Sequence, residues 1–265
     1  MTESRQSIDR LSVIGLALIM MPLMTMWHEI GGHAAACATF GGRIVAIGAF
    51  YVDCDGLDGL PAIVMSCAGV AVNALLAVVA YLLWRRATGD WARLVLWLLF
   101  LSQGFVASGY FAFSGIIGVG DLAPGAHGGL GPVAYPLAVR AAEALFGILI
   151  YSRLIRLGIN SLGDMLGRAP ATASARGAVG HTFYLTCGAA AVLVGLFNPL
   201  GLFILLASAA ASSFGGLAGF ISIGFSVPHG DGQRDFAIER NLWVFASGVL
   251  VTLGFAAVLG PTMRF

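Results

Sequence analysis

The chain has 265 residues, of which 58% are hydrophobic and only 10% are charged. A soluble domain has about 25% charged residues, so this chain cannot form an ordinary water-facing surface and is expected in a lipid bilayer. Its net charge of +1 excludes a basic nucleic-acid-binding surface. Its four cysteines include no CxxC pair, and we interpret them as small buried hydrophobic residues rather than as a redox or zinc framework.

Seven apolar segments are long enough to cross the hydrocarbon core of a membrane, which takes about 20 residues of helix. They are residues 11–37, 61–84, 92–114, 135–157, 182–198, 199–224 and 241–262. The sequence therefore predicts an all-α polytopic membrane protein with about seven transmembrane helices. We divide it into a membrane-embedded core of three spans, residues 1–125, and an additional bundle of four spans, residues 126–265.

Arginine supplies every basic charge and predicts the orientation of the chain. With seven spans, the loops on the N-terminal side contain eleven arginines and those on the opposite side only two, Arg43 and Arg264. Since basic residues concentrate in cytoplasmic loops, we expect an integral protein of a bacterial cytoplasmic membrane with a cytoplasmic N-terminus. The alternative for the first segment is a signal peptide, but residues 1–10 carry no net positive charge.

Three ionisable side chains lie close together in the first apolar segment: His28, Glu29 and His33, in the string HEIGGH. An ionisable residue in a membrane helix costs about 2.5–3.5 kcal/mol on insertion scales and is by default a candidate for function. Two histidines on one helix face, with a glutamate after the first, are typical of a zinc site with a glutamate general base. We therefore predict His28 and His33 as zinc ligands and Glu29 as the catalytic base. The alternative is a polar patch that packs helices together.

The spacing of the two histidines is unusual. The HExxH motif places them at i and i+4, whereas His28 and His33 stand at i and i+5. On a regular α-helix residues so spaced diverge by about 140°. They can face one metal ion only if the turn widens, for example into a π-bulge, which Gly31 and Gly32 would permit. If the helix stays regular, His33 is not a ligand.

The string HEIGGHAAA resembles the HExxH segment of the site-2 protease family, integral membrane zinc metalloproteases, with one residue inserted. The longer spacing is also similar to the HExxGH motif of dipeptidyl peptidase III, a soluble zinc peptidase. A second string, AGVAVNALLA at residues 68–77, resembles the AGPxxNxxLA helix of the membrane family. The resemblance covers roughly residues 20–125 and implies that Asn73 lies near the active site and binds substrate. A hydrogen bond between spans is the alternative role for Asn73.

The resemblance also implies a structure for the segment between the two motifs. Residues 42–58 alternate loosely and then become acidic. The family has a short β-hairpin at this place, where an extended substrate is bound by strand addition. We therefore expect a hairpin here and a membrane-anchored protein as the substrate.

A catalytic zinc site takes three protein ligands, so the two histidines leave one ligand unassigned. The family supplies an aspartate from a later helix, and order and spacing along the chain point to Asp121, although the family's NPDG pattern is absent. His127 is the alternative ligand. Gly118–Asp121 has the sequence GVGD and also matches the GxGD motif of intramembrane aspartyl proteases. Those enzymes need a second aspartate in a neighbouring span, which this sequence lacks.

Two functions of different classes follow. The first is an intramembrane zinc-dependent endopeptidase that cleaves membrane-anchored proteins within or near a transmembrane segment. The second is a seven-span transporter or metal-binding membrane protein without hydrolytic activity. The arginine distribution places HEIGGH in the outer half of the membrane, whereas the family holds its zinc nearer the cytoplasm, so the two indications disagree.

Overall fold

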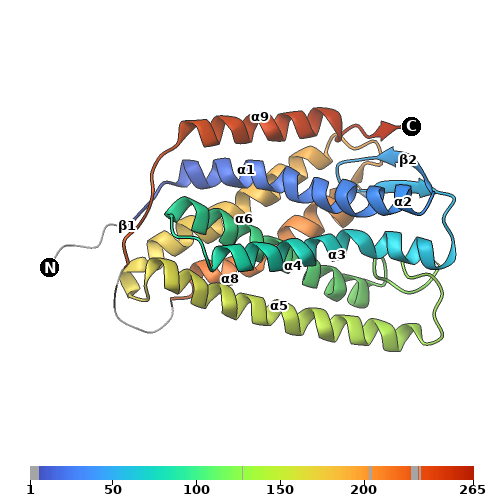
Figure 1. Cartoon of the computed structure of the whole chain (residues 1–265), viewed down its shortest axis with the longest axis horizontal. Helices are drawn as coiled ribbons and strands as arrows, with labels where there is room; N and C mark the ends of the chain where they lie inside the picture. Colours follow the sequence, from blue (N-terminus) through green and yellow to red (C-terminus); the bar gives the residue numbers. More distant parts are fainter. Residues whose placement is uncertain (1–5, 127, 203–204, 228–231, 233) are drawn as a thin grey trace.

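The structure, a computed structural model, describes residues 6–126, 128–202, 205–227, 232 and 234–265. Long helices lie side by side in one bundle, with β1 at one end and the C-terminus at the other (Figure 1). The first apolar segment is one continuous helix made of α1 (Arg10–Met26), the π-helix η1 (Trp27–Ala34) and α2 (Ala35–Thr39). The later helices are α3 (Gly59–Trp84), α4 (Asp90–Ile117), α5 (Pro136–Leu166), η2 (Pro170–Thr172), α6 (Ala173–Gly195), the π-helix η3 (Leu205–Gly215), α8 (Gly219–Phe225) and α9 (Leu242–Val258).

Helices occupy all seven predicted segments within the described chain, which confirms the helical, membrane-like architecture. Five helical stretches are long and apolar enough to cross a membrane: Arg10–Thr39, Gly59–Trp84, Asp90–Ile117, Pro170–Gly195 and Ser208–Phe225. The helix α5 is long but less apolar, because it carries Arg140, Glu143, Arg153 and Arg156. The apolar helix α9 has only 17 residues. The count of seven spans therefore stays a prediction.

Short strands lie at both ends of the bundle. At one end β1 (Gln6–Ile8) pairs in parallel with β4 (Phe236–Ile238). At the other end β2 (Arg43–Ile47) and β3 (Val52–Asp55) form the antiparallel hairpin that the resemblance implied. The C-terminal strand β5 (Met263–Arg264) covers the other edge of β2. Within the described part of this sheet, β3 keeps one free edge.

Small residues allow α1 and α9 to pack closely along the bundle (Figure 1). A Cβ atom on Gly15 would lie 2.7 Å from the backbone of Phe245, and one on Gly248 would lie 2.9 Å from the side chain of Leu18. At the same interface Thr252 donates a 2.7 Å hydrogen bond to the carbonyl of Leu18. Close backbone approach and side-chain hydrogen bonds are the usual basis of helix association in membranes, where lipid competes with apolar contacts.

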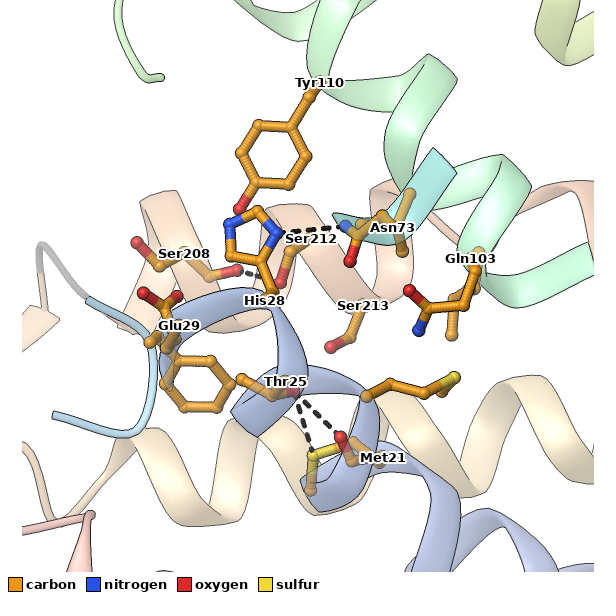
Figure 2. A pocket seen from close by; sticks show the side chains of 14 residues that line it. Met21, Thr25, His28, Glu29, Asn73, Gln103, Tyr110, Ser208, Ser212 and Ser213 are labelled. Atoms are coloured by element: carbon orange, nitrogen blue, oxygen red, sulfur yellow. Dashed lines mark hydrogen bonds between the residues drawn. The ribbon is translucent and has the colours of Figure 1, made fainter. Parts of the chain in front are cut away.

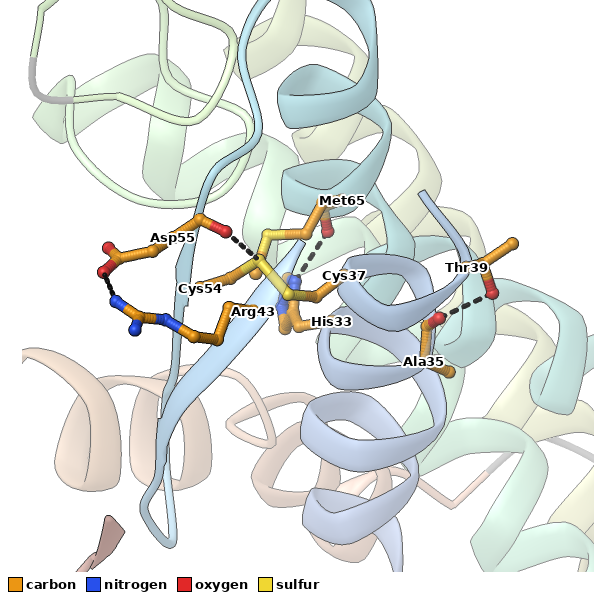
Figure 3. The surroundings of a disulfide bond; sticks show 8 residues. All are labelled: His33, Ala35, Cys37, Thr39, Arg43, Cys54, Asp55 and Met65. Carbon is orange, nitrogen blue, oxygen red and sulfur yellow. Dashed lines mark hydrogen bonds and ion pairs between the residues drawn. A yellow bond between two sulfur atoms is a disulfide. The ribbon is translucent and has the colours of Figure 1, made fainter. Parts of the chain in front are cut away.

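The interpretation of all four cysteines as buried hydrophobic residues is wrong for two of them. Cys37 in α2 and Cys54 in β3 form a disulfide (Figure 3), while Cys67 and Cys187 are free. The partners are 17 residues apart, and only the folding of the hairpin back onto the end of α2 brings them together. The bond ties the hairpin to the helix that carries His33.

This disulfide can be counted chemically. In protein purified without reductant and then unfolded, we expect two thiols per chain to react with a maleimide, and four after reduction. The variant Cys187→Ala is the control, because it should lower both numbers by one. Four reactive thiols before reduction would contradict the bond.

Candidate metal centre

The helix that carries HEIGGH widens at the motif, as predicted. Residues Trp27–Ala34 form a π-helix of eight residues, a longer distortion than the single bulge expected from the spacing. Backbone hydrogen bonds in a π-helix run between residues five apart, so such residues lie nearly above one another. The Nε2 atoms of His28 and His33 consequently face each other at 3.1 Å.

The two glycines of the motif act through packing rather than through unusual backbone angles, since neither Gly31 nor Gly32 has a positive φ. A Cβ atom on Gly32 would lie 2.6 Å from the Cα atom of Gly69 in α3. A Cβ atom on Gly69 would in turn lie 2.6 Å from Nε2 of His28 and would also collide with His33. The histidine pair is therefore covered directly by the backbone of α3.

Asp121 lies in the loop after α4 and reaches both histidines. Its Oδ2 atom is 3.3 Å from Nε2 of His28 and 3.3 Å from Nε2 of His33. Burial by itself would raise the pKa of Asp121, but the two imidazoles outweigh this effect and hold the pKa below its ordinary value. The side chain is therefore a carboxylate. Neither contact has hydrogen-bond geometry, so Oδ2 is buried without a hydrogen-bond donor among the described residues.

The spacing of the three candidate ligand atoms, Nε2 of His28, Nε2 of His33 and Oδ2 of Asp121, is compatible with a metal ion of the size of zinc. Their separations are 3.1, 3.3 and 3.3 Å, and ligands about 2.0–2.1 Å from a tetrahedral zinc ion lie about 3.3 Å apart. The triangle thus has the size of one face of a zinc coordination tetrahedron. Two imidazoles and a carboxylate are also a common set of ligands in catalytic zinc sites. Oδ2 of Asp121 has no hydrogen-bond donor among the described residues, and a bound cation would satisfy it instead.

Each histidine is held through its other ring nitrogen. Nδ1 of His33 lies 2.8 Å from the carbonyl oxygen of Met65 and must donate to it, which leaves Nε2 free to bind metal (Figure 3). Nδ1 of His28 lies 3.0 Å from Nδ2 of Asn73, whose Oδ1 atom has no partner among the described residues. A half-turn of this carboxamide brings Oδ1 onto a protonated Nδ1 and frees Nε2 of His28 in the same way.

A cavity inside the bundle is lined by His28 and Glu29 (Figure 2). Glu29 is only 5% exposed, and its carboxylate lies within 4.8 Å of the ligand nitrogens of both histidines. The lining includes residues from α1, η1, α3, α4 and η3, namely Met21, Thr25, His28, Glu29, Asn73, Gln103, Tyr110, Ser208, Ser212 and Ser213. A buried carboxyl group that lies beside both histidines and also lines the cavity is placed to exchange protons with a group bound there.

Several residues around the cavity were not predicted from the sequence. The ring of Tyr110 stacks on His28 with 4.9 Å between ring centroids. Gln103 is 1% exposed and lines the cavity from α4. A carboxamide in the middle of an apolar span could have been noticed, but which face of the helix it occupies depends on packing. Three serines of η3 also line the cavity.

The structure thus brings together the predicted residues His28, Glu29, His33 and Asp121, with Asn73 in contact with His28. The alternative ligand His127 lies outside the described residues. No family model, no curated protein and no solved structure matches this chain.

Proposed function

We propose that this chain is an intramembrane zinc-dependent endopeptidase that cleaves membrane-anchored proteins within or near a transmembrane segment. The observation that carries the proposal is the convergence of His28, His33 and Asp121 on one point, with Glu29 beside the two histidines and, like His28, in the lining of a cavity inside the helical bundle. A binding site alone would not need a buried carboxylate that stands beside three ligands and faces the cavity.

Each of these residues has a separate role in peptide hydrolysis. His28, His33 and Asp121 would hold the zinc ion, which supplies Lewis-acid polarisation of the scissile carbonyl and activates a water molecule near neutral pH. Glu29 accepts the proton of the attacking water and returns it to the leaving amide nitrogen. Met65 and Asn73 keep the imidazoles oriented through Nδ1.

Two other features fit a peptide substrate. Asn73 lines the cavity as well as contacting His28, so its second amide atom can hydrogen-bond to a bound peptide. The free edge of β3 can accept an extended segment by strand addition, since β5 already covers the outer edge of β2. The disulfide fixes this hairpin to the end of the helix that carries the motif.

The variant Glu29→Gln tests the proposal. Because Glu29 is assigned as a base and not as a ligand, we expect zinc content equal to that of the wild type and cleavage of a membrane-anchored reporter reduced by about 10²–10⁴-fold. Zinc is measured by mass spectrometry of the detergent-purified protein, and cleavage is followed by gel in proteoliposomes.

The matched control is Glu143→Gln. Glu143 is a second buried glutamate, on α5, but it does not line the cavity, so its loss should leave cleavage within about twofold of the wild type. Equal cleavage by wild type and Glu29→Gln would refute the endopeptidase. Zinc binding with no cleavage by any variant would favour the non-hydrolytic metal-binding protein.

We further propose that the N-terminus is cytoplasmic and that the metal site lies toward the opposite face. The arginine-rich loops gather at the end of the bundle where β1 lies, whereas the disulfide lies at the end with the hairpin and the C-terminus (Figure 1). Disulfides persist in oxidising compartments and are rare in the cytosol. The charge distribution and the disulfide therefore support the same orientation independently.

Cysteine accessibility tests this orientation. In intact cells a membrane-impermeant maleimide should label Arg264→Cys, whereas Glu3→Cys should react only after lysis. The parent protein, with its native cysteines, gives the background. Labelling of Glu3→Cys in intact cells would show that the orientation is inverted.

A further inference from the structure

The cavity lining contains several polar side chains besides Asn73. Gln103 points into the space that Asn73 and Ser213 also face (Figure 2). The Gln103 side chain is 1% exposed, and its carboxamide makes no hydrogen bond to any residue in the described ranges. A buried polar group without a partner is costly, so its retention needs an explanation.

The helix η3 adds serines to this lining in the spacing of a π-helix. Ser208 and Ser213 are five residues apart, as His28 and His33 are, and Ser212 stands between them. All three line the cavity. Ser212 donates its hydroxyl hydrogen to the carbonyl of Ser208, whereas the hydroxyl of Ser213, a residue that is 8% exposed, makes no hydrogen bond within the described chain. Ser213 and Gln103 therefore both have hydrogen-bonding capacity left over.

The cavity has room for several water molecules. It offers about 50 Å³ to the centres of water-sized molecules, and one water needs roughly 10–15 Å³ on this measure. Inside a membrane, a peptide chain that leaves its helix must find partners for each exposed N–H and C=O group, because lipid provides none. Side chains with unused donors and acceptors in the cavity that His28 also lines suit such groups.

We infer that Gln103 and Ser213 form a substrate subsite that hydrogen-bonds to the backbone of a locally unwound transmembrane segment beside the scissile bond. The inference rests on the proposed function for the identity of the occupant. It assigns to η3, which lies outside the residues that carry the resemblance, part of the cavity wall that His28 and Glu29 also line. The occupant is a peptide with broken helical hydrogen bonds, not a regular helix, because a regular helix has no free backbone groups to offer.

The variant Gln103→Leu separates a binding role from a structural one. If Gln103 only stabilised the fold, its replacement would lower the unfolding temperature. We expect the opposite, since an apolar side chain of similar size removes an unpartnered polar group, so the unfolding temperature should stay equal or rise. We also expect zinc content to be unchanged and the apparent affinity for a transmembrane reporter to fall about fivefold to tenfold, as does the affinity of Ser213→Ala.

Ser102→Ala is the matched control. Ser102 is the neighbour of Gln103, is also fully buried without a partner among the described residues, and does not line the cavity. It should bind and process the reporter as the wild type does. Gln103→Asn, which keeps a carboxamide, should recover part of the lost affinity. Reporter affinity of Gln103→Leu equal to that of the wild type would overturn the subsite.

Cross-linking tests the subsite without relying on cleavage. Gln103→Cys is placed in a chain with Glu29→Gln, Cys67→Ala and Cys187→Ala, and single cysteines are scanned along the reporter. We expect oxidation to link position 103 to a few consecutive reporter positions near the cleavage site. Links repeated with helical spacing, or no links, would overturn the subsite even if the wild type cleaves. Links at consecutive positions to a reporter that the wild type does not cleave would uphold the subsite and refute the peptidase.

Discussion

The variant His33→Ala should bind no zinc after dialysis against a weak chelator, while the wild type retains one ion per chain. His33 provides one of the three proposed ligand atoms, which lie 3.1–3.3 Å apart. Loss of a residue that only hydrogen-bonds to a metal ligand already costs about 10–100-fold in metal affinity, so loss of the ligand itself should cost more. Zinc content by mass spectrometry and reporter cleavage should fall together.

The controls for this experiment use the same residue types elsewhere in the chain. His181→Ala removes a histidine from α6, where its ring contacts the carbonyl of Ile221 at 3.2 Å, and should keep zinc. Asp121→Ala should lose zinc as His33→Ala does, whereas Asp58→Ala, at the exposed N-cap of α3, should not. Full zinc content in His33→Ala would show that His33 is not a metal ligand.

The variant Gly69→Ala should also abolish zinc binding, although it removes no ligand. A single methyl group at this position would overlap Nε2 of His33 and approach Nε2 of His28 to 2.6 Å. Both rings are fixed from behind, by Met65 and Asn73, so they cannot move aside without losing those bonds. Overpacking of this kind typically costs about 1–3 kcal/mol. We expect a lower unfolding temperature in detergent together with the loss of zinc.

Gly254→Ala provides the comparison for this effect. Gly254 lies in α9, and a Cβ atom there would meet nothing within 4 Å among the described residues. This variant should keep zinc and the unfolding temperature of the wild type. If Gly69→Ala bound zinc normally, the backbone of α3 could not lie against the histidines as closely as the structure places it.

Much of the fold followed from local sequence. A long apolar run must form a helix in a bilayer, because only a helix satisfies its own backbone hydrogen bonds there. The widened turn at HEIGGH also followed, since the spacing of His28 and His33 leaves them apart on a regular helix. The number of spans was less certain, because α5 carries charges and α9 is short.

The sequence by itself determined that the chain is membrane-like and that two histidines and a glutamate stand together in one apolar helix. Both features depend only on composition and on spacing within one helix. Asp121 was predicted as the third ligand from its order along the chain, but its contact with both imidazoles depends on the fold of its loop. Only the tertiary structure decided the pairing of Cys37 with Cys54, the close approach of Gly69 and the polar wall of Gln103 and Ser213. These features depend on which helix faces share an interface, and that choice is made by contacts between residues far apart in the chain.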